Sequence, residues 1–313
     1  METAPCPITG SREFTPFLQA PDRFNLQGQP WQIAQSTASG LVMLNPRPVA
    51  NEMATHYPAE AYDPFLHAGN ARALRDRIFL AASSLLLAGK ARIVMKSIDK
   101  PMDSVQVLEV GCSTGRLLLR IHRDYGVPLA NLCGVEIDQQ AAERARSAGI
   151  GSVSETGLDE TSFDRRFDRI VFWHALEHLH RINESLARAR ELLRPGGQLV
   201  IAVPNLQSDD ARRYGPNWIA LDAPRHLWHF TPETLQMLLE KHGFSVLETG
   251  RWIPDTLYNV WYSEKLECAV KGQRFGFGGI TRATTNALRS LAKGRDPRRA
   301  SSMIVRAVVE KRE

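Results

Sequence analysis

Short apolar runs alternate with amphipathic segments along the middle of the chain, between residues 105 and 250. A short apolar run bounded by turn residues is typical of a buried strand, whereas apolar residues spaced by three or four positions are typical of a helix. The runs that we interpret as strands are VQVLEVG, LCGVEID, FDRIVFW, QLVIAVPN, SVLETGRW and, near the C-terminus, SSMIVRAVV. The alternation predicts an α/β fold, with a doubly wound and mostly parallel sheet that carries helices on both faces.

Residues with strong preferences for helix ends mark where the predicted helices begin and stop. Asp138 and Thr231 are predicted N-caps, because their side chains can accept hydrogen bonds from the first turn. Asn183 is predicted to start the helix that ends at RPGG. Gly126 and Gly243 follow amphipathic segments, as glycines that end helices do. In such sheets, ligands bind beyond the carboxyl ends of the strands, so the turns there are the places to search for a site.

The regions outside this alternation predict three further segments. Residues 1–68 are rich in Pro, Gln and Thr and predict a small N-terminal subdomain of short strands and turns. Residues 69–104 predict a helical lid or linker, and residues 105–313 form the main domain. Within that domain, residues 255–298 predict a helical insertion before the last strand.

Composition limits the class of protein. The chain has 313 residues, of which 43% are hydrophobic and 23% charged, as in an ordinary globular protein. It has no run of about 18 apolar residues, so no stable membrane insertion is expected. The N-terminus has no apolar core and does not resemble a secretory signal. The four cysteines are scattered, which is typical of a reducing compartment, so we expect a cytoplasmic protein.

Positive charge is concentrated towards the C-terminus. From Asp255 onward there are twelve Lys and Arg residues against six Asp and Glu residues, whereas the rest of the chain is close to neutral. A solvated helical face accounts for this excess, and attraction to an anionic partner is the alternative. The sequence contains no helix-turn-helix, zinc finger or stacking motif, so no nucleic-acid partner is expected.

The run VLEVGCSTGRLLLR has the form of a strand, a glycine turn and a helix. A dinucleotide fingerprint needs a third glycine in the middle of this turn, where only Gly111 and Gly115 are present. Glu109 precedes the first glycine, and its carboxylate would repel a pyrophosphate but attract an ammonium or sulfonium group. The turn therefore indicates a cofactor that carries an amino acid, and it disfavours an NAD(P)-dependent oxidoreductase.

A second carboxylate ends the next predicted strand, GVEID. Glu136 lies about 20 residues beyond the glycine turn, where a carboxylate can accept hydrogen bonds from both hydroxyls of a ribose. The alternative is that an acidic residue here only caps the following helix. We assign the capping role to Asp138 and the ribose role to Glu136.

Four segments, VLEVGCSTG, GVEID, FDRIVFWHALEHL and LLRPGGQLVIAVPN, resemble class I S-adenosylmethionine-dependent methyltransferases in order and spacing. The resemblance covers residues 105–250 and implies the seven-stranded, Rossmann-like methyltransferase fold, with S-adenosylmethionine as cofactor. It also implies positions for the cofactor-binding residues: Glu109, Gly111, Cys112 and Gly115 around the methionine part, Glu136 on the ribose, Thr156 to Leu158 beside the adenine, and Trp173 and His174 near the cofactor and substrate.

A narrower resemblance is to a bacterial subgroup that includes sugar C-methyltransferases. The segments GLVMLNPRP and NWIALDAPRHLWHFTPETL carry it. Members with zinc have four cysteines in the N-terminal segment, where this chain has Cys6, Thr9, Ser36 and Ser39. One thiolate and three hydroxyls cannot form a tetrahedral zinc site, so we expect a remnant without metal. The resemblance also implies a lid that includes Tyr57, Tyr62 and the helix around residues 72–77.

Histidines are the candidates for a general base, because methyl transfer to a hydroxyl or a carbon acid requires loss of a proton. His226 lies in a loop near the expected substrate entrance, where it is a candidate base or substrate ligand. His178 is the second candidate, with a structural hydrogen bond to backbone as its alternative role. Arg225 is expected either to bind an anionic group of the substrate or to hold Asp222. Glu177 is expected to accept backbone N–H groups.

The sequence leaves two classes of function open. The first is a methyltransferase that acts on an O or C nucleophile of a small-molecule acceptor. The second is a methyltransferase fold that has lost catalysis and serves as a binding or scaffold protein. The intact turn and Glu136 favour the first. Within the insertion 255–298, the amphipathic run LYNVWYSEKLECAV is expected to cover the substrate pocket or to form a homodimer contact, with contact to a membrane surface as the less favoured alternative.

Overall fold

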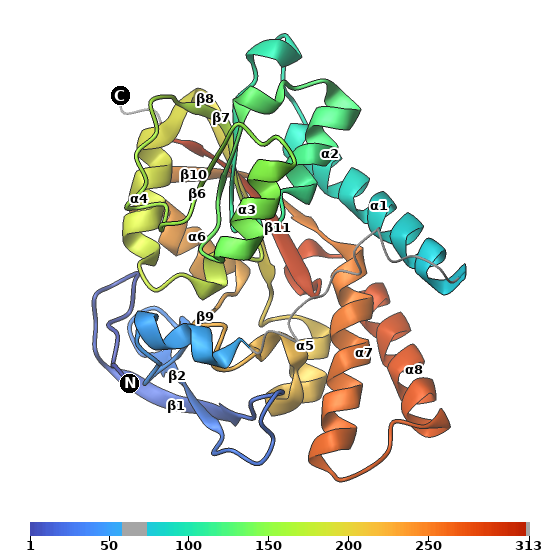
Figure 1. Cartoon of the computed structure of the whole chain (residues 1–313). Helices are drawn as coiled ribbons and strands as arrows, with labels where there is room; N and C mark the ends of the chain where they lie inside the picture. Colours follow the sequence, from blue (N-terminus) through green and yellow to red (C-terminus); the bar gives the residue numbers. More distant parts are fainter. Residues whose placement is uncertain (58–73, 311–313) are drawn as a thin grey trace. The chain divides into compact units, whose positions relative to one another are not determined.

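The structure, a computed structural model, describes residues 1–57 and 74–310, with side chains from residue 83 onward in the second range. Tyr62 and the side chains of residues 72–77, which were assigned to a lid, lie outside this description. The main sheet has the strand order β10 (Phe244–Arg251), β11 (Ser302–Val309), β8 (Leu193–Pro204), β7 (Phe167–Trp173), β4 (Val107–Val110), β5 (Leu132–Val135) and β6 (Ser152–Ser154) (Figure 1). Strand β4 pairs in parallel with β5 and β7, β5 pairs in parallel with β6, and β10 pairs antiparallel with β11. The predicted seven-stranded, mostly parallel sheet is confirmed.

The helices alternate with these strands as predicted. They are α1 (Leu74–Met95), α2 (Arg116–Tyr125), α3 (Gln139–Ser147), α4 (Ile182–Leu192), α5 (Asp209–Tyr214), α6 (Pro232–Lys241), α7 (Ile253–Val270) and α8 (Phe277–Lys293). Helices α7 and α8 form the helical insertion before the last strand, and they lie side by side in Figure 1. In the described part of the chain, no helix has the length and apolar character to cross a bilayer.

Most of the predicted helix ends are where the capping residues placed them. The Asp138 side chain accepts a hydrogen bond from the Ala141 N–H, and Thr231 forms a capping box with Thr234. One boundary was wrong: the fourth helix begins at Ile182, one residue before the predicted Asn183, and strand β8 begins at Leu193, before the RPGG sequence that was expected to end the helix. The sheet pairing of β8 therefore extends into residues that look like a turn in the sequence.

The chain divides into two compact units, which we describe separately. One contains Met1–Tyr57, His174–Asn183 and Ile201–Glu310, and the other contains the described residues of 58–173 together with Glu184–Val200. The boundary runs through β8, whose residues belong to both. The cofactor-binding candidates up to Leu158 lie in the second unit, and the candidate histidines lie in the first. The predicted domain boundaries at residues 68 and 104 stay predictions.

The N-terminal residues form a separate antiparallel sheet with the strand order β1 (Phe14–Ala20), β2 (Trp31–Ser36), β3 (Val42–Leu44) and β9 (Trp228–His229). Leu41, Val42 and Leu44, in and beside β3, are buried. Strand β9 comes from the loop that also carries His226. The pairing of β3 with β9 therefore attaches this sheet to that loop.

The four positions that correspond to zinc-binding cysteines in the resembling subgroup converge around Cys6. The Cys6 Sγ lies 3.1 Å from the Ser39 Oγ, and the hydroxyls of Thr9 and Ser36 lie close enough to favour its thiolate. Burial opposes ionisation of Cys6, but these hydroxyls together lower the pKa of its thiol below the usual value. Only the Ser39 hydroxyl has a hydrogen-bond distance to Cys6, and the buried Ser36 Oγ has no hydrogen-bond partner among the described residues. That this cluster holds no metal stays a prediction.

The turn after β4 packs closely on β5. A Cβ added at Gly134 of β5 would lie 2.4 Å from the Cys112 Sγ, much closer than real side-chain atoms approach. We predict that Gly134→Ala lowers the free energy of unfolding by about 1–3 kcal/mol, measured by urea denaturation, because the overpacked side chains must shift. Gly276→Ala is the matched control, since a Cβ there meets nothing within 4 Å, and it should change stability by less than about 0.5 kcal/mol.

A second substitution tests whether the lower stability of Gly134→Ala comes from the clash with Cys112 or from the loss of glycine itself. Cys112→Ala removes the Sγ, so combining it with Gly134→Ala should recover part of the lost stability. Unchanged stability in Gly134→Ala alone would contradict the close packing of this turn on β5.

Candidate functional site

The turn after β4 needs glycine at its ends. Gly111 and Gly115 have φ angles of 74° and 73°, in the left-handed region that side chains disfavour. A Cβ at Gly115 would also lie 3.1 Å from Ile150. Cys112 points its Sγ towards Gly134 of the sheet, so a cofactor contact from this residue would come from its backbone. The turn thus exposes backbone between a buried strand and a helix start, as phosphate- and cofactor-binding turns do.

Glu109 is a buried carboxyl group near the end of β4, and its Oε2 has no hydrogen-bond partner in the described part of the chain. Burial raises the pKa of Glu109 to about 8, with Lys90 opposing the shift and Glu136 adding to it. Lys90 comes from α1, and its Nζ lies 4.8 Å from the centre of the Trp173 ring. Sequence reasoning missed Lys90, which lies far from the turn in the chain. An ammonium group of a ligand would supply the partner that Glu109 lacks.

Glu136 is held by backbone on both sides of its carboxylate. Its Oε2 accepts the Ser113 N–H at 2.8 Å, and its Oε1 accepts the Asp138 N–H at 2.9 Å. Burial raises the pKa of Glu136, while these two hydrogen bonds lower it. Each oxygen keeps a further lone pair, so the group can still accept two ribose hydroxyls. The neighbouring Ile137 is 75% exposed, which leaves an apolar side chain next to this carboxylate for a flat ring to cover.

The loop after β6 carries the two residues assigned to the adenine. Three hydroxyls, from Ser154, Thr156 and Thr161, lie within 2.8 to 3.0 Å of one another and fix the loop. Leu158 is almost fully buried beneath it. Sequence reasoning named Thr156 and Leu158 but missed Ser154 and Thr161, because single hydroxyl residues have no recognisable spacing.

The second unit therefore brings together three features that suit one ligand. They are an unpartnered carboxylate oxygen on Glu109, a backbone-held carboxylate on Glu136 and a hydroxyl-fixed loop with a buried leucine. S-adenosylmethionine, the cofactor implied by the resemblance, has an ammonium, a ribose and an adenine in that order. The residues present fit it.

His174 lies in the first unit, directly after β7, with a φ angle of 52° that is strained for a side chain. Its Nε2 donates to the Asp255 Oδ2 at 2.8 Å, and its Nδ1 donates to the Glu177 Oε1 at 3.3 Å. Although burial opposes protonation, Asp255 and Glu177 raise the pKa of His174 to about 10. The side chain is therefore an imidazolium held by two carboxylates. Its assignment to the cofactor stays a prediction.

His178 and His226 lie against each other, with ring centres 4.5 Å apart. The His178 Nδ1 donates to the Arg225 carbonyl at 3.0 Å, with the Tyr57 hydroxyl at the same distance. This confirms the backbone hydrogen bond that was one of the two roles considered for His178. The His226 Nδ1 donates to the Ala220 carbonyl at 2.8 Å. Both rings thus keep an Nε2 with a free lone pair.

Burial lowers the pKa of His226 well below its usual value, and the nearby His178 and His229 lower it further. Burial also lowers the pKa of His229 to about 3. His226 is therefore neutral at pH 7. It is suited to accept a hydrogen bond or bind an ion, and it is a weak Brønsted base.

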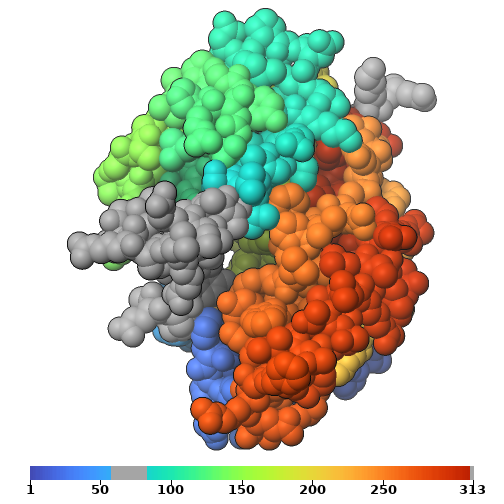
Figure 2. All heavy atoms as spheres, turned by 90° about the vertical axis from the view of Figure 1, so that its right-hand side faces the viewer, coloured from blue at the N-terminus to red at the C-terminus, as the bar shows by residue number. Residues whose placement is uncertain are grey.

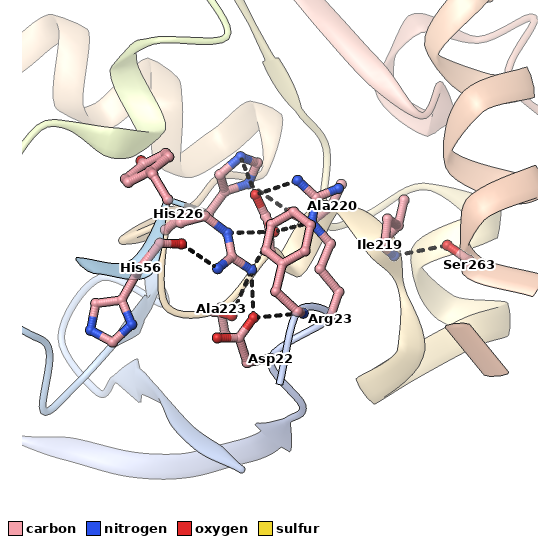
Figure 3. Close-up of polar contacts among 12 residues, drawn as sticks. Asp22, Arg23, His56, Ile219, Ala220, Ala223, His226 and Ser263 are labelled. Carbon is pink, nitrogen blue, oxygen red and sulfur yellow. Dashed lines mark hydrogen bonds and ion pairs between the residues drawn. The ribbon is translucent and has the colours of Figure 1, made fainter. Parts of the chain in front are cut away.

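Arg225 is fully buried and forms an ion-pair cluster (Figure 3). Its guanidinium donates to the Asp222 Oδ1 at 3.0 and 2.8 Å, to the Asp22 Oδ1 at 2.9 Å and to the His56 carbonyl at 2.9 Å. Arg23 donates to Asp222 from the other side. Of the two roles considered for Arg225, the structure shows that it holds Asp222, and it links the 222–226 loop to the N-terminal sheet through Asp22.

Glu177 differs from its expected role. It was expected to accept backbone N–H groups, and among the residues that the structure describes this was wrong: its Oε1 faces His174, and its Oε2 has no hydrogen-bond partner there. The whole residue is 0% exposed. A sequence does not distinguish the two cases, because the partner of Glu177 is His174, whose own second partner, Asp255, comes from α7.

Comparison with known proteins identifies the family. A family model described as a methyltransferase domain matches residues 49–249, about two thirds of the chain. The chain therefore belongs to the methyltransferase-domain family. The match begins before the glycine turn and ends within β10, so it includes both groups of candidate residues described above.

Several curated relatives are O-methyltransferases. The O-methyltransferase resE of Aspergillus sclerotiorum is 30% identical over 155 residues, which make up 45% of this chain and 55% of that protein. The ubiquinone biosynthesis O-methyltransferase of Azorhizobium caulinodans is 26% identical over 174 residues, or 52% of this chain and 67% of that protein. The matches span about half to two thirds of these relatives.

Solved structures show the same fold. A chain of the complex between the Haloferax volcanii Trm112 methyltransferase activator and the putative methyltransferase aligns with a TM-score of 0.51. The two chains are 14% identical, and the alignment covers 76% of this chain and 94% of that chain. At this identity the likeness concerns the fold alone.

We predict that binding of S-adenosylmethionine releases close to one proton per chain at pH 7. Free Glu109, with its pKa of about 8, is mostly protonated at this pH, and a bound ammonium would favour the carboxylate. Affinity should therefore weaken up to tenfold per unit as the pH falls below 8. Calorimetry in buffers of different ionisation enthalpy, between about pH 6 and 7, measures the released proton while the ammonium of the ligand, whose pKa is about 7.7–8.0, stays mostly charged.

Lys90 and Glu136 also face the Glu109 carboxyl group, and they could release a proton on binding as well. Glu109→Gln is therefore the control, because it removes only the titration of Glu109. The variant should bind more weakly and release no proton. Binding to the natural chain without proton release at pH 7 would contradict the contact between Glu109 and the ammonium.

We predict that Arg225→Met destabilises the protein by about 3–5 kcal/mol, because it leaves Asp222 and Asp22 buried without their main partner. Arg23→Met, which removes a more exposed partner of Asp222, should cost less. Adding Asp222→Asn to Arg225→Met should recover part of the loss, since it removes the unpaired charge. Urea denaturation measures the free energy of unfolding of the natural chain, the two single variants and the double variant. Equal stability of Arg225→Met and the natural chain would show that this cluster does not hold the loop.

Proposed function

We propose that this chain is an S-adenosylmethionine-dependent methyltransferase that transfers a methyl group to an oxygen or carbon nucleophile of a small-molecule acceptor. The observation that carries the proposal is the buried carboxyl group of Glu109 in β4, together with the carboxylate of Glu136 after β5, which accepts the Ser113 N–H of the glycine turn. A buried carboxyl oxygen without a partner costs about 1–3 kcal/mol of stability, which a bound ammonium would offset. Membership of the methyltransferase family and the O-methyltransferase relatives support the same reaction.

Methyl transfer requires mainly that the protein position the nucleophile beside the methyl group and exclude water from the site. In the transfer, the nucleophile forms a bond to the methyl carbon as the bond from that carbon to sulfur breaks, and a neutral thioether leaves. The protein must hold the nucleophile near the methyl group and accept or release its proton. His226 and His178 are the proposed residues for this second task, and the neutral state of His226 makes it able to accept a hydrogen bond from the acceptor.

Two finer proposals concern the setting of the enzyme. The four cysteines are free and buried, which supports action in a reducing cytoplasm. The cluster around Cys6 supports the resemblance to the bacterial subgroup with an N-terminal zinc segment, because the same four positions meet in space.

A homodimer through the insertion is also proposed. Helices α7 and α8 present large exposed side chains, and Figure 2 shows these helices as one continuous outer surface. The exposed members are Leu257, Tyr258, Trp261 and Tyr262 of α7 and Phe277, Ile280 and Leu288 of α8. Exposed apolar side chains of this size, gathered on two helices, are typical of a contact surface.

The alternative, a scaffold protein without catalysis, is less well supported. A scaffold has no use for an unpartnered buried Glu109 or for a Glu136 that is fixed by two backbone N–H groups. The unpartnered oxygen of Glu109 lowers stability unless a ligand is bound.

Binding of S-adenosylmethionine and its demethylated product, measured by calorimetry, tests the proposal. Glu136→Ala should weaken binding by 10- to 100-fold, because each charge-assisted hydrogen bond to the ribose contributes about 1.5–3 kcal/mol. Gly111→Asp should abolish binding, because it adds a side chain at a positive φ and a second charge beside Glu109. Glu143→Ala, on the exposed side of α3, is the control and should bind as the natural chain does.

Two results would contradict the proposal. Undiminished binding in both Glu136→Ala and Gly111→Asp would show that the cofactor is elsewhere. A folded natural chain that binds neither compound would favour the scaffold.

A further inference from the structure

Three potential metal ligands converge in the first unit, apart from the glycine turn. One ring nitrogen each from His178 and His226 and one carboxylate oxygen of Glu177 all lie within 4.8 Å of one another. Glu177 and His178 belong to the short helix η5 (Leu176–His178) after β7, and His226 belongs to the loop that follows η7 (Ile219–Leu221). The cluster thus combines two loops that are distant in the sequence.

The hydrogen bonds of the two rings leave each of them ready to bind a cation. Each Nδ1 donates its proton to a backbone carbonyl, of Arg225 for His178 and of Ala220 for His226. Metal-binding histidines are typically fixed in this way, with one nitrogen hydrogen-bonded and the other directed to the ion. The second nitrogen of each neutral ring is then the one that can bind the ion.

Glu177 supplies the independent observation that points to a missing ligand. The residue is fully buried, and its Oε2 has no hydrogen-bond partner among the described residues. Its Oε1 faces the His174 imidazolium, which Asp255 holds from the other side, so the carboxylate is oriented by a fixed neighbour. A buried carboxylate oxygen is costly to leave unpaired, and a cation is the partner that such an oxygen takes most strongly.

The donor set defines the class of ion. Two imidazole nitrogens and one carboxylate oxygen suit iron(II), manganese(II), cobalt(II) or zinc, whereas magnesium and calcium prefer oxygen donors alone. Bonds of about 2.0–2.2 Å would require the three donor atoms to move closer than they lie in the structure. The partly exposed His178 side chain can make this movement by rotation.

We propose that Glu177, His178 and His226 bind one divalent transition-metal ion. Three protein ligands leave positions open, as in catalytic rather than structural metal sites. The open positions would take a hydroxyl or carboxylate oxygen of the acceptor. This departs from the expectation of a chain without metal, which was based on the cysteine positions of the N-terminal segment.

The role of the ion in methyl transfer rests on the proposed function. A hydroxyl bound to the ion loses its proton to solvent more easily, as metal-bound water does. The resulting alkoxide would donate its electron pair to the methyl carbon, forming the oxygen–carbon bond as the carbon–sulfur bond breaks. With their remaining ring nitrogens bound to the ion, His226 and His178 would no longer accept the proton, and the ion would take over this task.

Titration with cobalt(II) tests the site, because this ion reports its ligands through visible absorption. The full-length protein is stripped with a chelator, titrated with cobalt(II) alone, and its bound metal is counted by mass spectrometry. We expect about one ion per chain, with the absorption of nitrogen and oxygen ligands and without a thiolate band. Glu177→Gln and His226→Asn should each weaken binding by at least tenfold.

Two controls distinguish this site from the rest of the molecule. His122→Asn, in the other unit, and Cys6→Ser, in the thiol cluster, should both bind cobalt(II) as the natural chain does. Circular dichroism checks that each variant is folded. A second readout is thermal unfolding: cobalt(II) should raise the melting temperature of the natural chain but not of Glu177→Gln.

Failure of this proposal and of the proposed function would look different. Less than about 0.1 ion per folded chain, or unchanged binding in both ligand variants, would overturn the metal site and leave the cofactor assignment intact. Glu136→Ala should lose the cofactor but keep cobalt(II). If the ion binds as predicted and its removal leaves methyl transfer unchanged, its role in activating the acceptor is wrong.

Discussion

A buried carboxylate needs a partner, and this requirement connects the main features of the molecule. Glu109 at the end of β4 and Glu177 after β7 are both buried, and each has one oxygen without a hydrogen-bond partner. Both lie at the carboxyl end of a strand of the main sheet, where α/β proteins bind their ligands. The buried carboxylate of Asp222, by contrast, is paired with Arg225. We therefore interpret Glu109 and Glu177 as groups whose partners are ligands.

The surrounding structure keeps these groups in place. Glycines at both ends of the turn allow Cys112 to pack on Gly134, and the turn in turn donates the Ser113 N–H to Glu136. Around Glu177, the His174 imidazolium and Asp255 fix one oxygen of the carboxylate. Arg225 holds Asp222 and so the loop that carries His226. Each arrangement fixes a binding group through residues that never touch the ligand.

Much of the fold follows from the sequence, because local signals decide it. The caps at Asp138 and Thr231 and the alternating runs predicted the helices and the sheet. The boundary at Leu193 was missed, because strand pairing across the sheet outweighs the turn preference of the RPGG sequence. Local preference is weak where long-range pairing competes with it.

The sites were predicted in part. Glu109 and Glu136 were found because their spacing from the glycine turn has chemical meaning. Lys90 and Asp255 were missed, since they reach their partners from other helices and no local pattern announces them. The free oxygen of Glu177 was likewise invisible, because a sequence shows which groups exist and only a structure shows which are left without a partner.

The most direct test of this account is a crystal structure with the demethylated cofactor product bound. The account predicts that the ammonium of the ligand lies about 3 Å from the Glu109 Oε2 and that the ribose hydroxyls donate to Glu136. A bound ligand that leaves the Glu109 Oε2 without a partner, or that meets neither carboxylate, would contradict it.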